Sequence, residues 1–159
     1  MKKNLLIFIP SLEDGGVEKN LYIISKYLSE KSVNISLLTC NFNKKHFFKK
    51  SIFYLGPKNN FWNEKSRKIK NLKCMIILFF NLMFFNKNYV IFAFQSSITA
   101  TIIGKIFGNK VITRANSSPS GFTNNALYLW LYRFFISFSD AVIVNSNEFS
   151  KLFFKTFGK

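Results

Sequence analysis

Apolar runs of strand length alternate with helical segments along nearly the whole chain. The first run, residues 4–9, is short and almost entirely apolar, and Pro10 follows it, which favours a buried parallel strand. Over residues 16–30 the apolar positions recur at helical spacing and predict an amphipathic helix with one apolar face. The residues of that face are Val17, Leu21, Ile24 and Leu28.

The alternation continues to the end of the chain. A polar stretch rich in Lys and Asn, residues 41–50, is expected to form a loop. Alternating strands and helices predict an α/β fold: a Rossmann-like parallel sheet with helices on both faces, in one domain of residues 1–159. We expect further strands at 34–40, 51–56, 89–94, 110–114 and 140–145, and further helices at about 64–85, 97–108, 124–138 and 147–157.

In sheets of this kind, ligands bind beyond the carboxyl ends of the strands, where loops lead into helices. The corresponding loops here are 10–16, 95–97, 114–123 and 145–147. Three of these four loops contain polar clusters that do not resemble core packing. We therefore expect a functional site among them.

The net charge of +16 at pH 7 is compatible with nucleic acid, an anionic membrane surface or anionic substrates as partners. A second explanation is codon bias, because Lys, Asn, Ile and Phe, which all have A/T-rich codons, are abundant. We expect no nucleic-acid binding: no reading motif is present, and the aromatic residues lie mostly in apolar runs. Lys outnumbers Arg by twenty to three, which makes each arginine worth locating.

The two cysteines, Cys40 and Cys74, lie in apolar surroundings without CxxC spacing. This favours reduced core residues of a cytoplasmic protein over a disulfide framework or a metal site. The apolar stretch that follows the first basic residues is too short for a secretory signal. We expect neither a metal nor a cofactor.

A basic stretch precedes the longest apolar run, residues 74–85, which is well short of the about 20 residues needed to span a bilayer. A basic segment that leads into a Phe-rich one is typical of a helix lying on an anionic membrane. A core helix with a solvated basic end is an equally good interpretation. The residues predicted to contact the membrane are Lys65, Arg67, Lys68, Lys70 and Lys73.

Two adjacent glycines, Gly15 and Gly16, stand between the first strand and the first helix. A helix N-terminus can receive a phosphate, and glycine lets the backbone approach it closely. Turn geometry alone also explains such a pair, and neither the GxGxxG nor the phosphate-loop pattern is present. The nearby acidic residues have a local explanation too, since Asp14 is placed to cap the helix and Glu18 to complement its dipole.

The loop 113–122 is the second candidate site. The guanidinium of Arg114 can bind phosphate or carboxylate with two hydrogen bonds, whereas Asn116 and Ser117 suit hydroxyl groups. The alternative is a polar loop whose arginine pairs with a carboxylate. Ser146, after the last strand, belongs to the same edge, and His46, the only histidine, is expected at the surface.

Two motifs carry a resemblance to a known family. The opening "IPSLEDGGVEKNLYIISKYLSEKSVNISLLT" resembles that of the family-four glycosyltransferases of GT-B fold, and "SDAVIVNSNEFSKLFFKTFG" (139–158) is similar to a later strand and helix of the same family. The resemblance covers the N-terminal, acceptor-side domain of that fold. It implies that Gly15 and Gly16 lie near the donor phosphate and sugar, with Glu18 shaping the turn, and it places Arg114, Asn116, Ser117 and Ser146 toward the acceptor.

The implied activity is that of a retaining hexosyltransferase that moves a sugar from a nucleotide-sugar to a lipid-linked or cell-surface polysaccharide acceptor. The Glu-x7-Glu pair of the donor-binding half does not occur in these 159 residues. We therefore expect the chain to be inactive alone, in the cytoplasm or peripherally on the cytoplasmic face of the membrane. The alternative function is a non-catalytic basic module that docks on anionic membranes.

Overall fold

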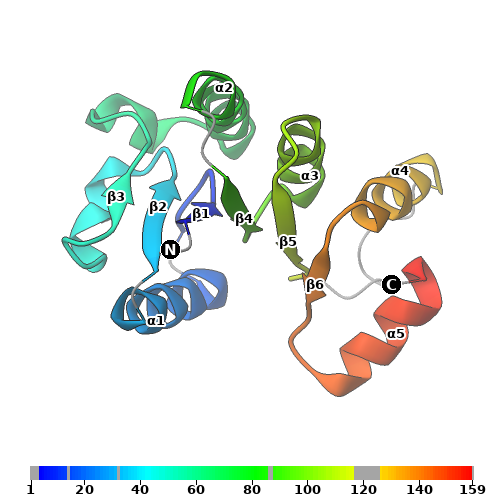
Figure 1. Cartoon of the computed structure of the whole chain (residues 1–159). Helices are drawn as coiled ribbons and strands as arrows, with labels where there is room; N and C mark the ends of the chain where they lie inside the picture. The colour runs from blue at the N-terminus through cyan, green and yellow to red at the C-terminus, as the bar shows by residue number, and fades with distance from the viewer. Residues whose placement is uncertain (1–3, 14, 32, 86–87, 117–125, 159) are drawn as a thin grey trace.

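The computed structural model describes residues 4–13, 15–31, 33–85, 88–116 and 126–158. Its six parallel strands form one sheet in the order β3-β2-β1-β4-β5-β6 (Figure 1). This is the strand order of a doubly wound Rossmann fold. In chain order the elements, with η for 3₁₀ helices, are β1 (Asn4–Phe8), α1 (Gly16–Glu30), β2 (Asn34–Leu38), η1 (Phe42–Phe47), β3 (Phe53–Tyr54), η2 (Asn60–Glu64), α2 (Arg67–Phe85), β4 (Tyr89–Ala93), α3 (Ser97–Ile106), β5 (Lys110–Arg114), α4 (Ala126–Ser137), β6 (Ala141–Ile143) and α5 (Asn147–Phe157).

The predicted α/β fold is confirmed. β1 lies in the middle of the sheet and pairs in parallel with β2 on one side and β4 on the other, so that Leu5 lies beside both Ile35 and Val90. The expected loop 41–50 is wrong in one respect, because η1 occupies most of it. The Phe42 ring packs edge-on against Tyr54, with ring centroids 5.6 Å apart, and this contact holds the segment against the sheet.

Alternate side chains of the central strands enter two different cores, as the pleat of a strand requires. Leu5 and Ile7 pack with Leu21 of α1 on one face. Leu6 and Phe8 pack with α2 and α3 on the other. Figure 1 shows α2, α3 and α4 along one face of the sheet and α1 against the opposite face.

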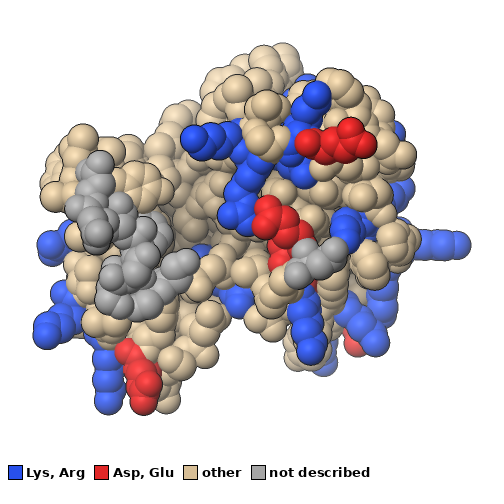
Figure 2. All heavy atoms as spheres, turned by 180° about the vertical axis from the view of Figure 1, so that it is seen from behind, with Lys and Arg blue, Asp and Glu red and all other residues tan. Residues whose placement is uncertain are grey.

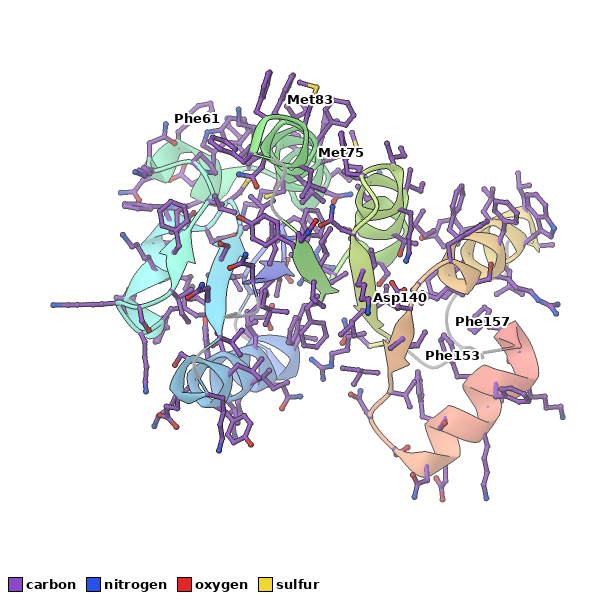
Figure 3. The ribbon with its side chains drawn as sticks, viewed as in Figure 1. Phe61, Met75, Met83, Asp140, Phe153 and Phe157 are labelled. Atoms are coloured by element: carbon purple, nitrogen blue, oxygen red, sulfur yellow. The ribbon has the colours of Figure 1, made fainter. Side chains whose placement is uncertain are left out.

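A third core joins α4 and α5 at the β6 edge of the sheet. In Figure 3, Phe153 and Phe157 extend from α5 toward α4. The Phe157 ring lies 5.0 Å from that of Tyr132, between ring centroids. This core positions β6 and the loop that follows it.

The two cysteines are free and fully buried, with their Sγ atoms 3.4 Å apart. Cys40 follows β2 and Cys74 lies on α2. The contact seats α2 over the end of β2, as expected of core cysteines.

Gly104 allows α3 to approach the sheet closely. A Cβ atom there would lie 2.6 Å from Cγ2 of Val111 and 2.9 Å from Cδ1 of Ile91. Both atoms belong to fully buried strand residues that have little room to move. The close packing of α3 on the sheet therefore requires a residue without a side chain at position 104.

We predict that Gly104→Ala lowers the free energy of unfolding by about 1–3 kcal/mol, because the added methyl group overpacks the α3–sheet interface. Gly16→Ala is the matched control. A Cβ at Gly16 meets nothing within 4 Å and the residue lies in the first turn of α1, so this change should be neutral or stabilising by up to about 1 kcal/mol. Urea unfolding followed by circular dichroism measures both, and equal effects would contradict the packing described for α3.

Candidate functional site

A pocket of about 730 Å³ lies at the carboxyl edge of the sheet, where the strand order reverses between β1 and β4. We call it the switch-point pocket. Its walls come from the start of α1, the N-terminal half of α2, the segments around the ends of β4 and β5, and α4. The lining residues that matter below are Arg67, Asn71, Gln95, Ser96, Arg114 and Asn116.

Three of the four loops that the sequence singled out meet at or beside this pocket, and the fourth contributes Asn145. The Gln95 side chain accepts a hydrogen bond from the amide of Ser11, at 3.4 Å. The Asn116 side chain donates one to the carbonyl of Phe94, at 2.6 Å. These bonds tie the segments after β1, β4 and β5 to one another.

Arg114 ends β5 and is only 7% exposed. Its Nη2 donates to Oδ1 of Asn145 at 3.1 Å, and its guanidinium carbon lies 5.5 Å from the centre of the Phe94 ring. Its Nη1 is buried without a hydrogen-bond partner. Burial lowers the pKa of Arg114 and the nearby Glu18 carboxylate opposes that shift, but an arginine remains charged at any physiological pH.

The other wall is the start of α3. Ser96, its N-cap, has φ 53° and ψ 47° and is the one described non-glycine residue in the left-handed region. Its side chain makes no capping bond. The first amides of a helix have no intrahelical acceptor, and Ser97 and Thr99, which line the pocket, belong to this uncapped first turn.

Acidic residues organise the glycine turn. Glu18 is 4% exposed, and its Oε1 accepts the amide of Glu13 at 3.1 Å. Glu13 in turn forms a two-point ion pair with Arg67, at 3.1 Å to Nε and 2.8 Å to Nη2. The acid thus fixes the turn and links it to α2. Asp14 lies outside the described residues, and the N-cap position belongs to Gly15.

Backbone conformation does not explain the glycine pair. Gly15 has φ −141° and ψ −179°, an extended conformation open to any residue. A Cβ at Gly15 would lie 3.1 Å from Oε2 of Glu18, whereas one at Gly16 would point into open space. The turn itself therefore does not need glycine at position 16.

Ser146, the other described residue that was predicted to bind the acceptor, does not line the switch-point pocket. Ser146 caps α5, because its Oγ accepts the amide of Phe149 at 3.2 Å. Its neighbour Asn145 is the residue that reaches Arg114. Ser117 lies outside the described residues. Sequence reasoning named the loop 145–147 but missed Asn145, and it assigned Arg67 to the membrane and not to this pocket.

The basic residues predicted to contact a membrane lie at the start of α2 in different environments. Lys65 sits 4.0 Å from the Phe61 ring centre and Lys73 5.2 Å from that of Trp62. Lys68 is exposed. Arg67 is held by Glu13, and Lys70 needs correction: it is 6% exposed, and burial lowers its pKa. Lys70 lies on the buried stripe of α2 and cannot present its charge as freely as the others.

The opposite stripe of α2 is apolar and exposed. Figure 3 shows Met83 pointing away from the sheet.

Figure 2 shows lysine and arginine side chains spread over one face of the molecule, with few acidic ones between them. None of the described helices is long and apolar enough to cross a membrane. The large apolar residues that α2 exposes are Ile69, Leu72, Ile76, Phe79, Phe80, Met83, Phe84 and Phe85.

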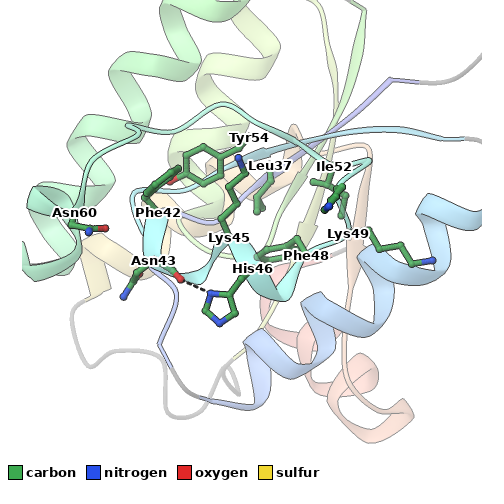
Figure 4. A pocket seen from close by; sticks show the side chains of 11 residues that line it. Leu37, Phe42, Asn43, Lys45, His46, Phe48, Lys49, Ile52, Tyr54 and Asn60 are labelled. Carbon is green, nitrogen blue, oxygen red and sulfur yellow. Dashed lines mark hydrogen bonds between the residues drawn. The ribbon is translucent and has the colours of Figure 1, made fainter.

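A second hollow, of about 830 Å³, lies at the β2–β3 edge, away from the four loops at which a functional site is expected (Figure 4). Phe42, Phe48 and Ile52 line it, together with several lysines. His46 is exposed on its rim, as predicted, with Nδ1 2.7 Å from the carbonyl oxygen of Asn43. No acid or nucleophile faces this histidine from the lining residues.

Asp140 of the second motif has a structural role. Its Oδ2 accepts from the Lys105 ammonium and from the amide of Val111, both at 2.6 Å. Burial opposes the charge on Asp140, but these two donors outweigh it and lower the carboxyl pKa. The residue joins α3, β5 and the start of β6.

Among the described residues, no group of three or more His, Cys, Asp or Glu side chains is placed to hold a metal ion. Neither a scan against models of protein families nor a search among curated proteins finds a match to this sequence. The chemistry of the switch-point pocket must therefore be judged from its own residues, which offer hydrogen-bond donors and cations and no paired carboxylates for acid–base work.

We predict that Asp140→Asn destabilises the fold at neutral pH and that the difference disappears in acid. Because the folded pKa is lowered, the stabilisation is present above the unfolded value of about 3.9 and is lost as pH falls through the folded pKa. The side chain is 38% exposed, so about 0.5–1 kcal/mol is expected.

Thermal unfolding from pH 3 to pH 7 measures this difference. Glu64→Gln is the control, since Glu64 is exposed and makes no ion pair among the described residues. A pH-independent difference between Asp140→Asn and wild type would contradict the role assigned to the carboxylate.

Proposed function

We propose that the chain is the acceptor-side half of a retaining glycosyltransferase of hexosyltransferase type. In this proposal it positions a lipid-linked or cell-surface saccharide, and a donor-binding half supplies most contacts to the nucleotide-sugar. The observation that carries the proposal is the switch-point pocket, which opens where doubly wound sheets bind ligands and is lined by Val17 after the glycine turn, by the start of α3 and by Arg114.

The residues of the pocket suit positioning more than bond making. Serine hydroxyls, the Asn71 amide and a buried guanidinium can hold a polyhydroxyl ligand in one orientation. Holding two substrates in register supplies a large part of catalysis when they must meet. Gly16 precedes Val17 of the lining, and because a Cβ at Gly16 would meet nothing within 4 Å, this turn leaves room for a sugar phosphate.

A second candidate function is docking of a non-catalytic basic module on an anionic membrane. The exposed apolar stripe of α2 favours it, because Lys65 and Lys68 stand at one end of a helix whose other half presents Phe80, Met83 and Phe84 to solvent. Both functions are compatible with a peripheral protein on the cytoplasmic face of the membrane, the location we propose for the chain.

For the transferase half, we expect the isolated chain to bind alkyl glycosides and short-chain lipid-linked saccharides saturably, to bind nucleotide-sugars weakly, and to transfer no sugar. Amide chemical shifts should change around Gln95, Thr99 and Asn116. Turnover of any nucleotide-sugar by the purified chain without a partner would overturn the half-enzyme proposal, and the absence of saccharide binding would overturn the acceptor role.

For membrane docking, we expect co-sedimentation with vesicles containing anionic lipid, weakened by salt because exposed charges are screened within about 8–10 Å. The double change Phe80→Ser with Phe84→Ser should reduce binding about tenfold or more. Changing Lys65 and Lys68 to Gln should reduce it on anionic vesicles alone.

The control for this experiment is Ile23→Ser with Tyr27→Ser, which removes two exposed apolar side chains from α1 on the opposite face. Equal losses from the two double variants, or salt-insensitive binding to neutral vesicles, would contradict an oriented electrostatic docking through α2.

A further inference from the structure

We propose that the switch-point pocket binds an anionic group, a phosphate or carboxylate, between the guanidinium of Arg114 and the N-terminus of α3. The proposed function does not say whether the acceptor is neutral or charged. This inference states that the acceptor carries an anionic group, which binds in the pocket. The anion site itself does not depend on the proposed function. Only the statement that its ligand is the acceptor rests on that function.

The first observation is the unsatisfied half of a buried cation. Arg114 is 7% exposed; its Nη2 donates to the neutral amide of Asn145, whereas its Nη1 is buried without a hydrogen-bond partner. A buried donor without an acceptor is costly, and the nearby Glu18 carboxylate offsets part of the charge of this guanidinium but is not the acceptor that Nη1 lacks. Arg114 lines the pocket, so an anion that enters the pocket can supply the acceptor that Nη1 lacks.

The second observation is the helix whose N-terminus lines the same pocket as this arginine. α3 is ten residues long, and Ser96 to Thr99 at its start line the same hollow. The N-terminus of a helix carries a partial positive charge and unpaired amides, and the Ser96 side chain does not cap them. The left-handed conformation of Ser96 is a backbone strain of the kind that clusters at binding sites.

The charges around the pocket are two arginines in its lining and two carboxylates beside them. Arg67 lines the pocket, and Lys70 lies close enough to Glu13 to interact with it. The acids are Glu13, engaged by Arg67, and Glu18, which accepts from the Glu13 amide and lies near Arg114. Lys70 does not line the pocket, so two arginines in the lining stand beside these two carboxylates. The Glu13–Arg67 pair is exposed and can open toward a ligand without loss of the core.

A neutral saccharide satisfies this arrangement less well than an anion. Hydroxyl groups can accept from Nη1 but bring no counter-charge, whereas phosphate and carboxylate oxygens match the fork of an arginine and the amides of a helix start. The anion can be a free phosphate or one carried on a sugar or lipid, because all three present the same oxygens.

The test is a titration of the ¹⁵N-labelled chain with inorganic phosphate and with glucose 1-phosphate, against sodium chloride of equal ionic strength and against glucose. We expect saturable shifts confined to the amides of residues 95–99 and the Nε of Arg114. Arg114→Gln should weaken phosphate binding at least about tenfold and Arg67→Gln about two- to threefold, since charge-assisted hydrogen bonds are the stronger ones. Tighter binding of the sugar phosphate than of free phosphate would identify the carried group as the ligand.

Arg133→Gln is the matched control, because Arg133 is the third arginine and lies on α4 outside the lining of the pocket. If Arg114→Gln does not fold, phosphate binding is measured with Arg67→Gln and Arg114→Lys in its place. Linear shifts spread over surface lysines, or equal phosphate binding by the Arg114 and Arg133 variants, would overturn the inference. Saccharide binding in the pocket without phosphate binding refutes the anion site alone, whereas phosphate binding without any saccharide binding refutes the acceptor role alone.

Discussion

The parallel pairing of β1 with both β2 and β4 is the constraint on which the rest of the structure depends. Because every strand runs in the same direction, all strand-to-helix segments leave from one edge of the sheet. The connection through α2 moves the chain to the other face, so the segments after β1 and β4 lead to opposite sides. The switch-point pocket is the opening between them, and the two-faced core of Leu5 to Phe8 keeps it in place.

The electrostatics of the pocket explain why a strongly basic chain concentrates acid at one turn. Glu18 holds the backbone of the turn, and Glu13 draws Arg67 from α2 toward it. Two of the three arginines therefore line the same pocket, while most lysines lie elsewhere. Codon bias can account for a surplus of lysine, but it does not account for where the arginines meet.

The fold followed from the sequence because parallel strands buried on both faces give nearly continuous apolar runs, and the helices between them keep a clear period. Contacts between side chains that are far apart in the sequence could not be predicted in the same way. The contact of Arg67 with Glu13 joins residues 54 positions apart, and that of Arg114 with Asn145 depends on β5 lying beside β6. Strand order decides both. The burial of Lys70 did have a signal, since it stands four residues before Cys74 on the stripe that continues to Leu78 and Leu82. The 3₁₀ turn of η1 had none, because its polar composition masks the contact of Phe42 with the sheet.

The most direct measurement is anomalous diffraction from crystals of the chain soaked in tungstate, an oxyanion with the charge and shape of phosphate. We predict a difference peak in the switch-point pocket, within hydrogen-bonding distance of Arg114 and of the first amides of α3. A peak only in the hollow beside Lys45, Lys49 and His46, or only at lysines on the outer surface, would contradict the assignment of the switch-point pocket as the site that binds the ligand.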